Sequence, residues 1–126
     1  MKTIRQSYQI DAPISKVWQA LVDPKLIKKW TGQAAVMDDQ VGTKFKLWGG
    51  DIYGTNTKVI PEQVLEQDWY AGDWPEPSKL VITLTLEENS TKVDLIHESI
   101  PEDEFDAINK GWKDYYFGPL KLILEK

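Results

Sequence analysis

The final stretch of the chain, residues 101–126, carries an aromatic stripe that limits what the whole chain can fold into. Phe105, Ile108, Trp112, Tyr115/Tyr116 and Ile123 recur at steps of three or four residues, which places them on one face of an α-helix. A stripe of this size must be covered, and the only large apolar surface upstream belongs to segments that alternate like β-strands. The sequence therefore predicts an α+β fold, in which a curved antiparallel sheet wraps around a long C-terminal helix.

The upstream segments predict a meander of six to seven strands with two short helices between the first two. Ile14, Val17, Trp18 and Leu21 have helical spacing, and a second helix is expected from Asp23-Pro24 to about Thr31-Gly32. From Gln33 onward the apolar period changes from 3.6 to 2. The expected strands cover residues 2–10, 33–38, 43–48, 52–60, 63–70, 79–87 and 91–100.

One dipeptide interrupts the pattern of the C-terminal helix. Gly118-Pro119 falls inside the apolar stripe. Proline removes a backbone hydrogen bond and clashes with the carbonyl four residues back. We therefore expect a kink or break near Phe117.

Composition narrows the classes of partner and compartment. The 126 residues are enough for a single domain spanning 1–126, and the formal net charge of −5 disfavours binding to nucleic acid or to an anionic membrane. We see no secretory signal and no stretch long and apolar enough to cross a bilayer. With no cysteine in the chain, nothing points to an oxidising compartment, so the cytoplasm is the expected location.

The chemistry of the side chains favours a binding function over catalysis. His97 is the only histidine and shares strand parity with Val93 and Leu95, so it is expected to face the interior, either as a satisfied core residue or as the polar handle of a cavity. One histidine without a thiol makes a metal site improbable, and no serine elbow or phosphate loop is present. We predict no catalytic constellation, no metal and no cofactor.

The space between the sheet and the final helix is the expected ligand site. Asn56 has the parity of Ile52 and Ile60, so it faces a ligand, a water, or the outside if the strand bulges at Gly54. The residues predicted to line the cavity are Phe45, Ile52, Asn56, Trp69, Leu84, His97, Phe105, Ile108, Trp112 and Tyr116.

Two features are candidate contacts with a partner protein. Trp74 lies in a loop bounded by prolines, where a tryptophan is less obliged to be buried and can cover the cavity mouth or meet a partner. Lys25, Lys28 and Lys29 lie on the second short helix, where they form either a solvated face or a contact with an acidic surface.

Several segments, in their order and spacing, resemble a known family. These are Val17-Trp18, Lys29-Trp30, Gly50-Asp51-Ile52-Tyr53-Gly54, Pro61-Glu62 ahead of Trp69, Trp74-Pro75-Glu76, Ile82-Thr83-Leu84-Thr85-Leu86 and Gly111-Trp112-Lys113-Asp114-Tyr115-Tyr116-Phe117. The chain resembles the activators of the heat shock protein 90 ATPase, in particular their C-terminal domain, within the START-like helix-grip superfamily. The resemblance implies a helix-grip fold and a chaperone-binding role, with the outer sheet face and loops as the docking surface.

Three functions stay open at this point. The first is binding to a chaperone of the heat shock protein 90 type, which the resemblance implies. The second is carriage or sensing of a small apolar ligand held between sheet and helix. The third, which we rank last, is an enzyme with His97 as acid or base. Fold alone does not decide among them, and the oligomeric state is not readable from the sequence.

Overall fold

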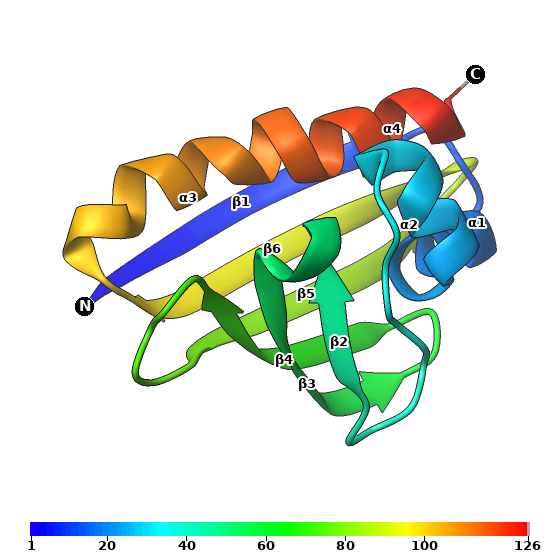
Figure 1. Ribbon diagram of the computed structural model, residues 1–126. Helices are drawn as coiled ribbons and strands as arrows, with labels where there is room; N and C mark the ends of the chain where they lie inside the picture. The colour runs from blue at the N-terminus through cyan, green and yellow to red at the C-terminus, as the bar shows by residue number, and fades with distance from the viewer. Residues whose placement is uncertain (126) are drawn as a thin grey trace.

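The computed structural model describes residues 1–125, and Figure 1 shows the arrangement of their helices and strands. Six strands form one antiparallel sheet in the order β1-β6-β5-β4-β3-β2. The strands are β1 (Lys2–Ile10), β2 (Lys44–Leu47), β3 (Ile52–Ile60), β4 (Val64–Ala71), β5 (Ser78–Glu87) and β6 (Ser90–Ile100). The helices are α1 (Ile14–Val22), α2 (Pro24–Thr31), α3 (Phe105–Gly111) and α4 (Gly118–Leu124), with short 3-10 turns η1 (Trp48–Gly50) and η2 (Glu102–Glu104) and a π-helical stretch η3 (Trp112–Phe117).

The C-terminal helix lies across the curved sheet, as the aromatic stripe predicts. In Figure 1 it runs from orange to red alongside β1, with α1 and α2 at the end of the molecule where the chain terminates. The inward residues of the central strands alternate as expected, with Leu80, Ile82 and Leu84 buried in β5. Trp112 and Phe117 of the helix are buried in the same core. The predicted helix-grip architecture is confirmed.

The second short helix, α2, begins and ends where its sequence signals indicate. The Asp23 side chain accepts a hydrogen bond from the backbone N–H of Lys25 at 2.8 Å and so caps α2. Gly32 ends α2 in the left-handed region, at φ 81°. The indole Nε1 of Trp30 donates to the carbonyl of Ala20 at 2.9 Å, which holds α2 against α1.

The expected strand over residues 33–38 is wrong. Only one isolated bridge forms there, in which Val36 and Lys46 exchange two backbone hydrogen bonds of 2.9 Å. Beyond it the segment is held by a side chain, because the Nδ2 of Asn56 donates to the carbonyls of Asp38 and Gln40 at 3.1 and 3.3 Å. These bonds satisfy loop carbonyls that a continued ladder would otherwise engage.

The expected break near Phe117 is wrong, because the chain stays helical from α3 through η3 into α4. The irregularity expected there takes the form of the π-helical stretch η3, which ends at Phe117. Figure 1 shows one continuous helical ribbon there. The backbone N–H of Gly118 donates to the carbonyl of Lys113, five residues back instead of four. This wider turn places Pro119 in the first turn of α4, where its missing N–H is tolerated. The last predicted helix residue, Lys126, lies outside the described residues.

No helix within residues 1–125 is long and apolar enough to span a membrane.

Candidate functional site

A pocket of about 300 Å³ lies between the first half of the C-terminal helix and the β2–β3 side of the sheet. Its walls come from η1 and the start of β3, from β4, and from α3 and η3. The lining residues are Trp48, Asp51, Ile52, Trp69, Ala107, Ile108, Gly111, Trp112, Tyr115 and Tyr116. The lining is mainly apolar, and five of its ten residues are aromatic.

The pocket exists because α3 presents small side chains to the sheet. Every residue of α3 is at least partly exposed, whereas Trp112, Tyr116 and Phe117 of the following η3 are buried. Ala107 and Gly111 lie four residues apart, on one face of the helix. A Cβ added at Gly111 would meet only the Cδ2 of Tyr115, at 3.7 Å. The helix surface therefore leaves space unfilled at this point.

The inner wall is a stack of aromatic rings. Trp112 stacks on Trp69 with ring centroids 5.5 Å apart and contacts Tyr116 at 4.6 Å. Trp48 meets Tyr116 edge-on at 6.2 Å. Burial raises the pKa of the Tyr116 hydroxyl above its ordinary value, so this ring stays neutral. Asp51 is the one carboxylate in the lining, and no basic residue lines the pocket in the described part of the chain.

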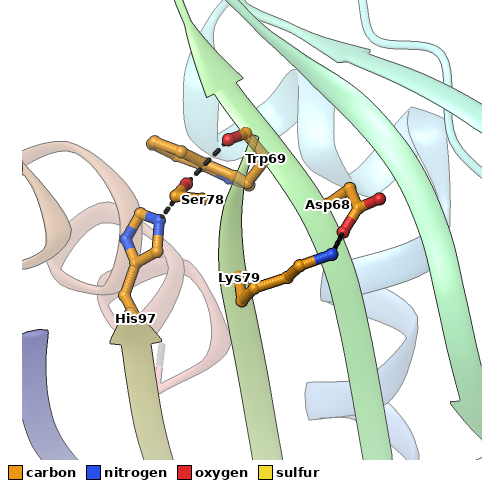
Figure 2. A network of polar contacts seen from close by, with 5 residues as sticks. All are labelled: Asp68, Trp69, Ser78, Lys79 and His97. Atoms are coloured by element: carbon orange, nitrogen blue, oxygen red, sulfur yellow. Dashed lines mark hydrogen bonds and ion pairs between the residues drawn. The ribbon is translucent and has the colours of Figure 1, made fainter. Parts of the chain in front are cut away.

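His97 lies behind this wall and holds it in place. Figure 2 shows its ring on β6 pointing to Ser78 on β5. The His97 Nε2 and the Ser78 Oγ are 2.7 Å apart, and the Ser78 hydroxyl donates to the Trp69 carbonyl at 2.7 Å. The indole Nε1 of Trp112 donates to Nδ1 of His97 at 3.1 Å. Because an indole N–H is only a donor, Nδ1 must accept, and the ring proton belongs on Nε2.

This arrangement requires a neutral imidazole. His97 is fully buried, and burial lowers its pKa from the ordinary 6.5 to about 3. A second proton on Nδ1 would also point at the donor N–H of Trp112. Both ring nitrogens are engaged and the ring is not part of the pocket lining, so His97 positions two tryptophans and has no nitrogen available to a substrate.

The structure brings half of the predicted lining residues together. Ile52, Trp69, Ile108, Trp112 and Tyr116 line the pocket. The other five lie elsewhere: Phe45, Leu84, Asn56 and His97 are buried outside the lining, and Phe105 is half-buried at the start of α3.

Asn56 belongs to a separate buried amide pair. Its Oδ1 accepts from Nε2 of Gln67 at 2.9 Å, and Gln67 is buried as well. The pairing of β3 with β4 shifts between Asn56 and Lys58, after this residue and not at Gly54. Asn56 therefore faces inward and is satisfied by protein atoms, which replaces the expectation of a water or a solvent-facing side chain.

Five lining residues were missing from the prediction, namely Trp48, Asp51, Ala107, Gly111 and Tyr115. Trp48 has a positive φ of 50°, in the 3-10 turn that follows β2. The strand parity that places Phe45 inside therefore does not extend to Trp48. The Gly49-Gly50 pair is the only signal in the sequence that the strand ends here.

The candidate partner contacts lie on two separate surfaces. Trp74 is half-buried and packs against Trp69 with ring centroids 6.2 Å apart, so its loop contacts the aromatic wall without lining the pocket. Lys25, Lys28 and Lys29 are exposed on α2. Among residues 1–125, no group of three or more His, Cys, Asp or Glu side chains is placed to hold a metal ion.

Comparison with known proteins agrees with this fold. The chain is 28% identical over 108 residues to human activator of 90 kDa heat shock protein ATPase homolog 1, covering 84% of this chain and 32% of that protein. It is 25% identical over 115 residues to the homolog from Dictyostelium discoideum, covering 89% of this chain and 30% of that protein. The chain thus spans about a third of the length of these curated relatives.

Solved structures give the same picture. The Aha1 dimer from Colwellia psychrerythraea superposes with a TM-score of 0.85 at 28% identity, covering 99% of this chain and 97% of that one. An HSP90 activator from Plasmodium falciparum has a TM-score of 0.91 at 24% identity, covering 98% and 96%, a likeness that shows the fold alone.

The family model for activator of Hsp90 ATPase homolog 1-like proteins matches residues 11–125, which include α1, α2, five strands and the entire aromatic helix. On this match, together with the helix-grip architecture, the chain belongs to the family of activator of Hsp90 ATPase homolog 1-like proteins.

Proposed function

We propose that the protein works by binding a chaperone of the Hsp90 class. The family match over residues 11–125 carries this proposal. The curated relatives are named for activation of the 90 kDa heat shock protein ATPase. Because the chain spans only about a third of their length, stimulation of the ATPase is part of the proposal. The absence of cysteine is consistent with the cytoplasm as its proposed location.

The outer face of the sheet is the proposed docking surface, because the helix occupies the inner face. On this outer face Tyr53 and Tyr70 stack with ring centroids 5.0 Å apart and planes 3° from parallel. Both rings are partly exposed, and the Lys79–Asp68 ion pair seen in Figure 2 lies beside them. Exposed tyrosines backed by a rigid sheet are typical of binding hot spots. Lys25, Lys28 and Lys29 on α2 form a second candidate contact, with an acidic surface.

Calorimetric titration of the purified chain with the host's own Hsp90-type chaperone tests this proposal, alongside the chaperone's ATPase rate. We expect measurable binding that Tyr70→Ser weakens. Tyr115→Ser is the matched control, because Tyr115 is 68% exposed and lies on the helix, away from the outer sheet face. No binding at high micromolar concentrations would remove the proposal. Equal losses from the two tyrosine variants would remove only the docking surface.

A second function has its own supporting observation, the pocket of about 300 Å³ with a mainly apolar lining. We propose that the pocket holds a small ligand with an apolar body, as a carrier or sensor would. Native mass spectrometry of the purified protein should detect a small molecule that Gly111→Leu excludes. We do not propose an acid or base role for His97, since its ring is buried and both nitrogens have partners.

A further inference from the structure

We infer that the pocket beside α3 is selective for an organic cation, a quaternary or tertiary ammonium group with apolar substituents. This inference rests on the proposed ligand-binding role and adds the chemical class of the ligand. It comes from the composition of the wall, where five aromatic rings and a single carboxylate surround the space.

Aromatic rings favour a cation over a neutral group of the same shape. The faces of tryptophan and tyrosine rings carry partial negative charge, and tryptophan binds cations best of the aromatic side chains. Trp48, Trp69 and Trp112 all line this pocket together with Tyr115 and Tyr116. Trp69 and Trp112 are 4% and 2% exposed, so a ligand that touches them leaves bulk water behind.

Asp51 gives the wall its charge preference. It is exposed, so its carboxylate stays solvated without a ligand, and no Lys or Arg among residues 1–125 lines the pocket to neutralise it. The negative net charge of the chain acts in the same direction. An anionic ligand would meet the carboxylate and the electron-rich rings without a compensating cation. A neutral ligand without an O–H or N–H donor would gain nothing from Asp51.

The shape of the pocket suits the apolar substituents of such a cation. Ala107, Ile108 and Gly111 of α3 and Ile52 of β3 provide the remaining wall. The three aliphatic side chains offer dispersion contacts and no hydrogen bond, and Gly111 adds no side chain. A quaternary ammonium group has no N–H donor and a tertiary one has a single donor, so either fits this wall better than a primary ammonium with three donors.

The test compares two probes of the same shape, phenyltrimethylammonium and its uncharged carbon analogue tert-butylbenzene. Binding is followed through the indole N–H resonances of the six tryptophans in a ¹⁵N-labelled sample, which Trp→Phe variants assign. We expect the cation to shift the resonances of Trp48, Trp69 and Trp112 and to bind about tenfold more tightly than the neutral probe.

Two variants separate the effect of the Asp51 charge from the effect of the pocket volume. Asp51→Asn keeps the shape of the side chain and should weaken the cation about fivefold, with no change for tert-butylbenzene. The matched control is Glu98→Gln, which removes an exposed carboxylate from β6, outside the pocket lining, and should leave both probes unchanged. Gly111→Leu should block both probes by filling the space.

The outcomes distinguish the inference from the proposal beneath it. If both probes bind equally well, or if Asp51→Asn leaves their ratio unchanged, cation selectivity is wrong and the ligand pocket stands. If neither probe shifts the tryptophan resonances up to its solubility limit, the pocket does not bind molecules of this size, and the inference falls together with the proposed ligand function.

Discussion

The two halves of the C-terminal helix follow one another without a break, yet they contact the sheet in opposite ways. In the second half, Trp112, Tyr116, Phe117 and Leu120 are all buried, and α4 contacts both α1 and α2. In the first half every residue of α3 is partly exposed, and the pocket lies beneath it. The same helix is thus anchored at one end and held away from the sheet at the other.

The two glycines of this helix show the same contrast. Gly111 and Gly118 both have helical backbone angles, φ −61° and −59°. A Cβ at Gly111 would stand in nearly open space, whereas a Cβ at Gly118 would lie 2.4 Å from the carbonyl oxygen of Lys113. Gly111 leaves room for a ligand. Gly118 lets its own backbone N–H approach the Lys113 carbonyl and form the π-helical hydrogen bond.

The largest loss of stability should come from removing the Trp112 ring, which anchors the second half of the helix. Trp112→Ala deletes a buried ring and leaves the His97 Nδ1 without a donor, so it should lower the free energy of unfolding by about 3–5 kcal/mol. Ile108→Ala, on the other half of the helix, should cost about 1 kcal/mol because Ile108 is only half-buried. Urea denaturation of both variants measures the difference. Equal losses would mean that the two halves do not differ in this way.

Gly118→Ala should cause the next largest loss of stability. The added methyl group must displace the Lys113 carbonyl from its hydrogen bond, which we expect to cost up to about 3 kcal/mol. Thermal and urea unfolding would measure the loss. If Gly118→Ala is neutral, the π-helical stretch converts easily to another geometry, and the explanation for this glycine is wrong.

The third prediction concerns pH and sharpens the role of His97 in the anchored half. The folded-state pKa of about 3 lies below the unfolded value of 6.5. As the pH falls below 6.5, the His97 imidazole binds a proton in the unfolded chain but stays neutral in the folded chain. Stability should therefore decrease as the pH is lowered, by about 2 kcal/mol between about pH 7 and pH 5.

The measurement is urea denaturation across this pH range for the native chain and for His97→Gln. Since His97 is the only histidine, the variant should lose most of the slope while starting from a lower stability at neutral pH. A slope unchanged in His97→Gln would assign the pH effect to carboxyl groups.

The smallest expected effect has the opposite sign. Gly111→Ala should stabilise the protein by about 0.5–1 kcal/mol, because alanine is the better helix former and its methyl group meets no close neighbour. The melting temperature should rise, while Gly118→Ala lowers it. A loss of stability in Gly111→Ala would show that the space beneath α3 is already filled.

What the sequence predicted well came from periodicity. Helical spacing places Trp112 and Tyr116 inward, and strand parity places Leu84 and His97 inward, all correctly. These predictions depend only on which face of an element a residue occupies.

The features that the sequence does not predict depend on tertiary contacts between helices and strands. The partners of His97 come from β5 and from the helix. Trp48 enters the pocket through a positive-φ turn, and Gly111 matters through a side chain it lacks. Helix and strand periods carry no information on these tertiary contacts or on the size of the space between them.

The π-helical stretch also determines which side of α3 faces the sheet. Each residue of an ordinary α-helix turns the chain by about 100°, and the hydrogen bond from Gly118 to Lys113 spans one residue more than an α-helical one. If residues 112–117 kept their number but wound as a regular α-helix, α3 would turn by about that angle about the helix axis. Ala107 and Gly111 would then rotate away from the sheet and a different face of α3 would meet it. The ligand chamber is therefore maintained by a backbone irregularity one turn further along the chain.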